Sequence, residues 1–349
     1  MRVVFRCDAG PVVGAGHVMR CVALAEELAS RGVRPVFVCD VEELPWVREQ
    51  LDRRGFDVLP ASTDVREPRP AAVVLDSYLL PPGVSTAWRA EGVPVLALVD
   101  GSLRGRVADL YVDQNLGAEQ ASVDLPAGSR RLAGLDYAML RDETLAARPA
   151  APPVDGGRGA PEVVAVFGGT DAHGAAPVLV DALAATGLPF TATIVSATDA
   201  LAAAVRAVPS SGEQHVRPIP PTSRLAELVA SADLVISAAG SSTWELLSLG
   251  AAAAVVRVAD NQREGYDRTA ATGAVAGLGA LADIRRSPTE ATAVLVGLLT
   301  SPEDRAAMRR RAWHLVDGAG RRRVADALLG TITRTRSGQG RAVGELAVE

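Results

Sequence analysis

Nearly continuous apolar runs alternate with helix-type segments along most of this chain, and this alternation limits its possible folds more than any other feature. The runs at residues 2–6, 71–78 and 94–100 are rich in Val and Leu, as strands buried on both faces are. Residues 17–30 instead have apolar side chains at steps of three and four, which is typical of a helix packed on a sheet. The alternation predicts an α/β protein with doubly wound parallel sheets.

The pattern starts a second time after residue 161, so we expect two domains. A chain of 349 residues is longer than a single domain usually is. Residues 148–161 are rich in proline and glycine, which interrupt helices and strands, and the run that begins at Glu162 is again strand-like. We therefore predict an N-terminal domain at residues 1–147, a linker at 148–161, a second domain at 162–330 and a loosely ordered tail at 331–349.

The charges are nearly balanced and are spread along the chain. Lys and Arg number 36 and Asp and Glu 41, for a net charge of −5, which argues against a nucleic-acid-binding protein with a basic face. No apolar run is long enough to span a membrane, no secretory signal is recognisable, and the three cysteines form no paired motif. We expect a cytoplasmic protein without a membrane span.

The usual cofactor motifs are missing from the sequence. Gly14-Ala15-Gly16-His17 resembles the start of a dinucleotide fingerprint, but Met19 stands at the third glycine position and the loop before Gly14 is too long. No Gly-Lys-Ser/Thr phosphate loop occurs, and the histidines lack the spacing of a metal site. We therefore expect no cofactor and no catalytic metal.

His17 is the first candidate for chemistry, because the glycine-containing loop places it at the start of a predicted helix. The partial positive charge of a helix N-terminus disfavours imidazolium, so we expect a neutral ring that is available as a base. The alternative is that His17 is only a polar residue of the first helical turn. Asp8 and Arg6 are expected either to orient His17 or a sugar substituent, or to form a local ion pair that braces the loop.

A second candidate group, Asp76-Ser77-Tyr78, ends a predicted strand. Ligands bind beyond the carboxyl ends of the strands in open parallel sheets, so Tyr78 is placed to hydrogen-bond a substrate or a catalytic group. Simple packing of the Tyr78 ring is the alternative.

Polar turns follow three apolar runs of the predicted second domain. They are Gly168-Gly169-Thr170, Gly240-Ser241-Ser242-Thr243 with Glu245 just beyond, and Asp260-Asn261-Gln262. The second turn precedes a predicted helix, so its backbone amides are expected to bind a diphosphate, and Glu245 to accept hydrogen bonds from ribose hydroxyls. The alternative is an ordinary helix N-cap at Ser242 or Thr243.

Taken in order, six short motifs resemble one family. They are RxD…GxGHxxR at 6–20, DSY at 76–78, GLDYAMLR at 134–141, FGGTD at 167–171, SAAGSSTWEL at 237–246 and DNQ at 260–262. This set, between Arg2 and about Gly279, resembles the UDP-2,4-diacetamido-2,4,6-trideoxy-β-L-altropyranose hydrolases of pseudaminic acid synthesis. It is also similar to related spore-coat polysaccharide glycosyltransferase-like proteins. The resemblance implies a GT-B fold, in which two Rossmann-like, doubly wound domains face a central cleft.

The resemblance also implies roles for individual residues. His17 would activate water for attack at sugar C1, with assistance from Tyr78 and Asn261. The segment from Gly240 to Glu245 would hold UDP. With the candidates found above, the full set expected to bind the nucleotide sugar is Arg6, Asp8, Gly14, Gly16, Arg20, Gly168, Gly169, Thr170, Gly240, Ser241, Ser242, Thr243, Glu245 and Gln262. The family commonly has two acidic residues where this chain has Asp100-Gly101-Ser102, which leaves the identity of the sugar open.

These features favour a hydrolase that cleaves the C1–O bond of a UDP-linked amino or deoxy sugar and releases UDP and free sugar. One alternative is an inverting GT-B glycosyltransferase that passes the sugar to an acceptor in polysaccharide or natural-product synthesis. A second alternative is a non-catalytic nucleotide-sugar-binding protein. The sequence does not indicate the oligomeric state.

Overall fold

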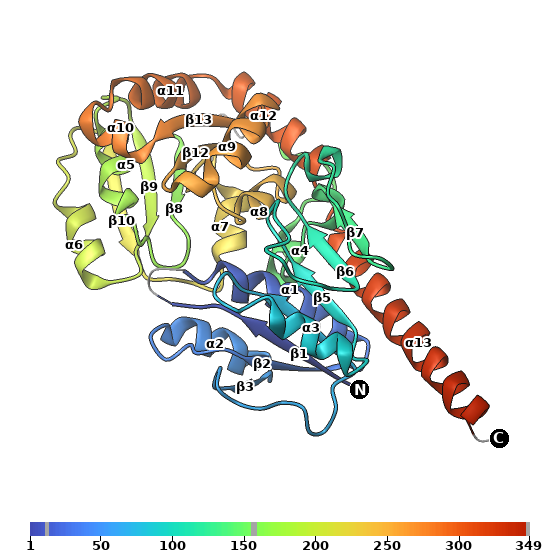
Figure 1. Ribbon diagram of the computed structural model, residues 1–349. Helices are drawn as coiled ribbons and strands as arrows, with labels where there is room; N and C mark the ends of the chain where they lie inside the picture. The colour runs from blue at the N-terminus through green and yellow to red at the C-terminus, as the bar shows by residue number, and fades with distance from the viewer. Residues whose placement is uncertain (11–13, 155–158, 347–349) are drawn as a thin grey trace. The chain divides into compact units, whose positions relative to one another are not determined.

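The computed structural model describes residues 1–10, 14–154 and 159–346, with side chains up to residue 337 (Figure 1). The chain forms two compact units. One comprises residues 1–141 together with the segment from Gly318 to the C-terminus, and the other comprises Asp142–Asp317.

The first unit contains a seven-stranded parallel sheet in the order β3-β2-β1-β4-β5-β6-β7. Its strands are β1 (Arg2–Cys7), β2 (Arg34–Val38), β3 (Asp57–Leu59), β4 (Ala72–Asp76), β5 (Val95–Leu98), β6 (Leu110–Asp113) and β7 (Arg130–Ala133). The strand order reverses between β1 and β4, where Cys7 lies opposite Asp76. A reversal of this kind leaves a crevice at the carboxyl ends of the two strands, which is the usual ligand site of such sheets.

Helices cover both faces of this sheet. They are α1 (Gly16–Ser30), α2 (Pro45–Arg53), α3 (Gly83–Ala90), the 3-10 turns η1 (Ala118–Gln120) and η2 (Leu135–Tyr137), and α13 (Gly320–Leu346). The apolar side chains of α1, among them Val18, Val22 and Leu28, are fully buried against the sheet. On the same face Phe5 and Phe37 stack with ring centroids 5.0 Å apart.

The second unit repeats the design with a six-stranded parallel sheet in the order β10-β9-β8-β11-β12-β13. Its strands are β8 (Glu162–Val166), β9 (Phe190–Val195), β10 (Gln214–Ile219), β11 (Leu234–Ala238), β12 (Ala253–Arg257) and β13 (Val275–Ala280). The order reverses between β8 and β11, where the Ser237 hydroxyl donates a 2.8 Å hydrogen bond to the carbonyl of Val166.

The helices of the second unit follow its strands in alternation. They are α4 (Asp142–Ala147), α5 (Ala175–Ala184), α6 (Asp199–Arg206), α7 (Leu225–Ser231), α8 (Thr243–Ser248), the 3-10 turn η3 (Asp260–Gln262), α9 (Arg263–Ala271), α10 (Leu281–Arg286), α11 (Thr289–Thr300) and α12 (Pro302–Leu315). Within the described residues, every helix of the chain is too short or too polar to cross a membrane.

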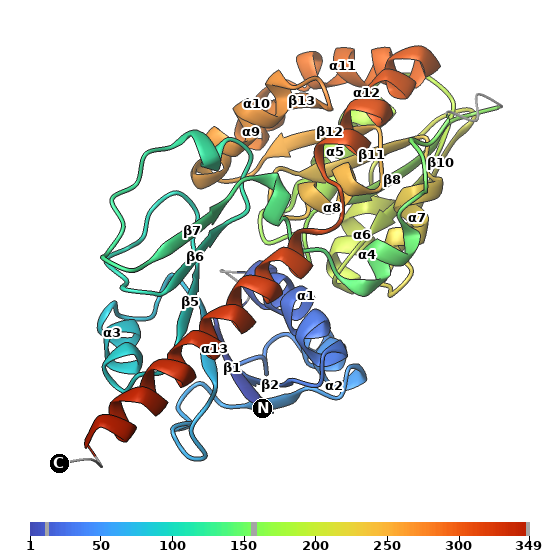
Figure 2. The ribbon, with the colours of Figure 1, turned by 90° about the vertical axis from the view of Figure 1, so that its right-hand side faces the viewer.

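The C-terminal segment differs from the expected second-domain end and loosely ordered tail. Residues from Gly320 to Leu346 form one helix that belongs to the first unit and packs beside α1 (Figure 2). The reason is an apolar stripe, since Val324, Leu328 and Ile332 recur at four-residue steps and are buried in the core of the first unit. Residues 347–349 lie outside the described residues.

The helix also explains why position 320 is a glycine. A β-carbon added at Gly320 would lie 2.2 Å from the carbonyl oxygen of Ala138, so only glycine allows this close approach.

The first boundary also lies earlier than the sequence indicated, because α4 belongs to the second unit. Arg148, expected in the linker, is bound within that unit: it donates to Ser248 Oγ at 3.1 Å and to the carbonyl of Trp313 at 3.1 Å. Positions 155–158 of the expected linker lie outside the described residues.

We predict that α13 is an integral part of the first unit. Replacing the fully buried Leu328 by Ala removes core contacts and leaves a cavity, so the free energy of unfolding falls by about 2–5 kcal/mol. Thr333, exposed on the same helix, is the control, and Thr333→Ala changes the free energy by less than about 0.5 kcal/mol. Urea unfolding measures both variants, and an unchanged midpoint for Leu328→Ala would contradict the packing.

Candidate functional site

Polar side chains gather in the first unit where β1, β4 and β5 end. Asp8 follows β1, Tyr78 lies two residues beyond β4, and Asp100 lies two residues beyond β5. After β1, Gly10 and Gly14 pair through two backbone hydrogen bonds, and Gly14 has φ +78°, a value that favours glycine. Gly14 lies two residues before α1, whose second residue is His17.

The ring of His17 lies between two carboxylates. Its Nδ1 is 3.9 Å from Asp8 Oδ2 and its Nε2 is 4.0 Å from Asp76 Oδ1. His17 is only 8% exposed, and within the described residues Nδ1 is buried without a hydrogen-bond partner. The Tyr78 ring meets the imidazole edge to face, with centroids 4.5 Å apart. His17 is therefore more than a solvated residue of the first helical turn, and it has two anions within reach.

Asp8 is held by the loop that follows β4. Its Oδ2 accepts hydrogen bonds from the backbone amides of Tyr78, at 2.6 Å, and Leu79, at 3.2 Å. Among the described residues Asp8 thus pairs with amides rather than with Arg6, so the ion pair considered from the sequence does not form. Arg6 itself lies half-buried near the end of β1.

Arg20, on the next turn of α1, binds two carboxylates at once. Its Nε and Nη2 donate to Asp76 at 2.5 and 2.7 Å, and its Nη1 and Nη2 donate to Asp100 at 2.8 and 3.1 Å. Burial lowers the pKa of the Arg20 guanidinium, but the charges and hydrogen bonds of Asp76 and Asp100 outweigh this and raise it. In the structure Arg20 therefore braces the strand ends.

Asp100 joins this group although the sequence did not single it out as a site residue. Besides Arg20, it accepts from the Tyr78 hydroxyl at 2.6 Å and from Asn115 Nδ2 at 3.1 Å. Burial opposes ionisation of Asp100, but the charge and hydrogen bonds of Arg20 prevail, so the pKa of Asp100 lies well below its usual range. Burial and the neighbouring Asp100 carboxylate raise the pKa of Tyr78.

Two arginines of the loop after β5 approach the same tyrosine loop. Arg104 has φ +52° and its guanidinium lies 4.1 Å from the centroid of the Tyr78 ring, a cation–π contact. Arg106 is buried and donates to the carbonyl of Ser77. Gly101 and Gly105 on either side of Arg104 are typical of a tight loop, but nothing in their spacing indicates contact with Tyr78.

In the second unit, the turn between β11 and α8 presents unused backbone donors. Thr243 N donates to Gly240 O at 2.9 Å, which places Ser241 and Ser242 at the centre of the turn. Within the described part of the chain, the amides of Ser241 and Ser242 have no hydrogen-bond partner. Ser242 occupies the N-cap position but its side chain forms no capping bond, so the ordinary cap considered from the sequence is not formed.

The remaining predicted residues of this turn lie close by. Thr243 Oγ1 is buried without a partner among the described residues, and Glu245 lies in the first turn of α8. A β-carbon at Gly240 would be 3.8 Å from Gln262 Nε2, so η3 adjoins the turn. Gln262 Oε1 accepts from the amide of Val258 at 2.9 Å, and Asn261 is exposed.

The turn after β8, with Gly168, Gly169 and Thr170, is different. Asp171, which has φ +46°, accepts from the amides of Ala175 at 2.7 Å and Ala176 at 2.9 Å. The N-terminus of α5 is thus capped by a carboxylate of the protein itself. Of the two turns, the one at Gly240 is better suited to an external anion.

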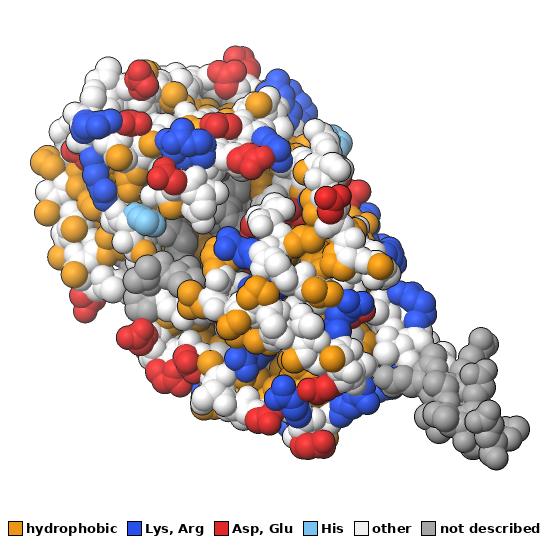
Figure 3. All heavy atoms as spheres, in the orientation of Figure 1, with side chains coloured by type: hydrophobic (Ala, Val, Ile, Leu, Met, Phe, Trp, Pro, Cys, Tyr) orange, Lys and Arg blue, Asp and Glu red, His pale blue; other side chains and the backbone are white. Residues whose placement is uncertain are grey.

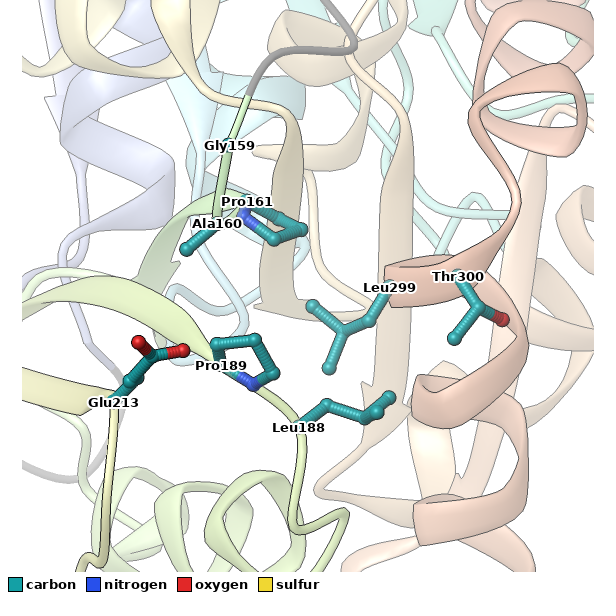
Figure 4. A pocket seen from close by; sticks show the side chains of 8 residues that line it. All are labelled: Gly159, Ala160, Pro161, Leu188, Pro189, Glu213, Leu299 and Thr300. Atoms are coloured by element: carbon teal, nitrogen blue, oxygen red, sulfur yellow. The ribbon is translucent and has the colours of Figure 1, made fainter.

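A cavity of about 290 Å³ lies elsewhere in the second unit (Figure 4). Pro161, Leu188, Pro189 and Leu299 line it, at the amino ends of β8 and β9 rather than at their polar carboxyl ends. Its lining is mostly apolar, so we assign no catalytic role to this cavity.

Two further features concern the distribution of surface charge and the arrangement of possible metal ligands. On the face shown in Figure 3, acidic and basic side chains of the described residues are interspersed. The described residues contain no cluster of three or more His, Cys, Asp or Glu side chains arranged to hold a metal ion.

Comparison with known proteins identifies the fold. The sequence matches no protein-family model and no curated protein. Among solved structures, MurG of Acinetobacter baumannii is similar over 95% of this chain and 100% of its own, with 17% identity and a TM-score of 0.67. The fold is GT-B. The prediction of two Rossmann-like, doubly wound units is thereby confirmed.

Two further GT-B structures contain nucleotides. The glycosyltransferase VinC in complex with dTDP has 14% identity and a TM-score of 0.65, over 96% of this chain and 100% of that one. The UDP-GlcNAc 2-epimerase of Neisseria meningitidis bound to UDP-GlcNAc has 14% identity and a TM-score of 0.62, over 95% and 100%. At these identities the similarity shows the fold and leaves the reaction to be argued from the site.

We predict that Asp100 makes this GT-B protein sensitive to acid. Its pKa is lowered by folding, so its stabilising contribution is complete above the unfolded-state pKa of about 4 and is lost as the pH falls further. Asp100→Asn should lower the free energy of unfolding at pH 7 by about 1–3 kcal/mol and flatten its decline between about pH 5 and 2. Urea unfolding at several pH values tests this.

Asp283 provides the control for this experiment, because it forms an exposed ion pair with Arg286. Exposed pairs contribute little, so Asp283→Asn should follow the wild-type pH profile. An identical profile for Asp100→Asn would contradict the role given to Asp100.

Proposed function

We propose that this GT-B protein transfers a sugar from a nucleoside diphosphate to an acceptor hydroxyl, with inversion at C1 and with His17 as the general base. The proposal rests on one observation above all: a buried imidazole lies between two carboxylates at the switch point of the first sheet, 3.9 and 4.0 Å from them. An imidazole in such a position is suited to accept a proton from a hydroxyl group.

In the proposed step, the acceptor O–H gives its proton to His17 while its oxygen attacks sugar C1. The bond between C1 and the diphosphate oxygen breaks on the opposite face, and the nucleoside diphosphate leaves with the electron pair. The imidazolium that forms is stabilised by the nearby carboxylates of Asp8 and Asp76. Asp8 is itself fixed by two backbone amides, so this charge is in place before the reaction.

We further propose that the turn Gly240–Thr243 binds the diphosphate. Its support is the pair of unused amides at Ser241 and Ser242, which lie next to the start of α8. Glu245, in the first turn of that helix, would accept hydrogen bonds from the ribose. The dTDP and UDP-GlcNAc bound by VinC and by the epimerase support a pyrimidine nucleotide as the ligand class.

Hydrolysis is the second candidate, and the ordered motif set from Arg6 to Gln262 favours it. Water would then take the place of the acceptor hydroxyl, with the same base and the same leaving group. Tyr78 and Asn261 are proposed to assist in either reaction.

The decisive experiment measures the release of nucleoside diphosphate from a set of UDP- and dTDP-sugars, with and without acceptor alcohols. We expect release to depend on an acceptor, and we expect His17→Ala to lower the rate by about 10²–10⁴-fold because the base is lost. His215→Ala, at an exposed position on β10, is the matched control and should retain full activity.

Two outcomes would change these assignments. Rapid release without any acceptor would replace transfer by hydrolysis, and full activity of His17→Ala would exclude His17 as the base.

A separate prediction concerns the diphosphate turn. Ser241 occupies the second position of the four-residue turn from Gly240 to Thr243, where proline is compatible with the backbone. Ser241→Pro therefore removes one amide donor with little distortion, and it should weaken binding of UDP by about 10-fold or more. Ser241→Ala keeps the amide and should bind UDP nearly as the wild type does.

Isothermal titration calorimetry with UDP compares the two variants, and thermal unfolding confirms that both are folded. Equal affinities for Ser241→Pro and Ser241→Ala would show that the amide does not contact the nucleotide.

A further inference from the structure

The carboxylate of Asp100 has no capacity left for a ligand. Its Oδ1 accepts from Arg20 Nη1 at 2.8 Å and from Asn115 Nδ2 at 3.1 Å. Its Oδ2 accepts from Arg20 Nη2 at 3.1 Å and from the Tyr78 hydroxyl at 2.6 Å. An ionised carboxylate accepts about four hydrogen bonds, and these four donors fill it. Asp100 therefore acts on a ligand only through the groups that it holds.

The bond from Tyr78 to Asp100 fixes the direction of the phenolic proton. A carboxylate paired with a buried guanidinium stays ionised and can only accept, so the tyrosine must be the donor. A phenol has one hydrogen, and here it is committed to Asp100 Oδ2. Only lone pairs remain on the Tyr78 oxygen. This hydroxyl can therefore accept a hydrogen bond from another partner but cannot donate one.

Tyr78 is also open to a ligand beside the proposed base. The residue is 37% exposed, although its hydroxyl is anchored. Its ring contacts the His17 imidazole edge to face and lies under the Arg104 guanidinium. A molecule whose reacting atom approaches His17 would therefore lie next to the Tyr78 ring and its hydroxyl.

We propose that Asp100 is a positioning residue that makes the Tyr78 hydroxyl an obligatory hydrogen-bond acceptor. The site then selects sugars that present a hydrogen-bond donor, either a hydroxyl or an amide N–H, at the position facing Tyr78. This inference rests on the proposed function, because it takes the ligand of the first unit to be the sugar of a nucleotide sugar. It adds a rule for which sugars bind: a substituent of the same size that cannot donate is rejected.

The rule follows from the cost of unmatched polar groups. When two acceptors face each other in a desolvated site, neither is satisfied, and the typical loss is about 10–100-fold in affinity. A purely structural role for the network would lower the affinity for all sugars together and would leave their relative affinities unchanged.

Deoxyfluoro sugars test this directly, because fluorine is close to a hydroxyl in size but cannot donate. The probes are UDP-glucose, UDP-N-acetylglucosamine and dTDP-glucose, each with analogues fluorinated at C3, C4 or C6, and UDP-2-O-acetylglucose, in which an ester oxygen replaces the amide N–H. Equilibrium binding is measured by calorimetry in a His17→Asn background, which prevents turnover.

We expect the protein to prefer the donor over the non-donor at one sugar position by about 10–100-fold. Tyr78→Phe, which removes only the hydroxyl, should abolish the preference at that position and at no other. Asp100→Asn should also abolish it, because an amide N–H facing Tyr78 frees the phenolic proton to point toward the ligand. Arg104→Ala removes the cation above the ring but keeps the bond to Asp100, so it should retain the preference.

The outcomes distinguish a failure of the proposed function from a failure of this further inference. If none of the nucleotide sugars binds, the proposed function fails and the inference falls with it. If nucleotide sugars bind but no donor preference exists, or the preference survives in Tyr78→Phe, the inference alone is overturned.

Discussion

The first unit depends on one buried charge, the guanidinium of Arg20. Placing a charged group in a protein interior is costly unless it is paired, and here four hydrogen bonds to Asp76 and Asp100 provide the pairing. These bonds tie α1 to the ends of β4 and β5, so the helix that presents His17 cannot shift without breaking them. The positions of His17, Tyr78 and the Asp100 carboxylate are therefore consequences of a single ion-pair cluster.

The two units have sheets of the same type but offer different chemical groups where the strand order reverses. At the switch point of the first sheet, side chains supply the functional groups: carboxylates, an imidazole and a phenol. At the switch point of the second sheet, the backbone supplies them, through the unused amides of Ser241 and Ser242. Side chains suit proton transfer because they titrate, whereas amides suit anion binding because their partial charge is permanent. Because Asp171 already caps α5, the turn at Gly240 is the one that we propose for the diphosphate.

Local patterns predicted the elements well and the contacts between them poorly. The spacing of apolar residues from 17 to 30 gave α1 to within one residue, and His17 was recognised because a glycine loop and a helix start are both local signals. Arg20 was assigned to the ligand, since nothing within the sequence near it shows that its partners lie 56 and 80 residues away. Asp100 was noticed only as a departure from a motif, and its four donors come from three distant segments. The helix α13 was not predicted, because polar and glycine residues are interspersed with its apolar stripe. The partner of that stripe, α1, is distant in the sequence.

The choice between transfer and hydrolysis is not made by the base. An imidazole beside two carboxylates accepts a proton from water or from an alcohol in the same way, and under the proposed function the same amides would stabilise the leaving diphosphate in both reactions. What separates the two reactions is whether water or an alcohol occupies the position opposite the diphosphate. The groups around His17 bear on this because they are fixed in advance: Asp8 by amides, Tyr78 by Asp100, and Asp100 by Arg20. A site with so little rotational freedom would discriminate by matching donors to acceptors, and an acceptor sugar with several hydroxyls would offer more such matches than a single water molecule.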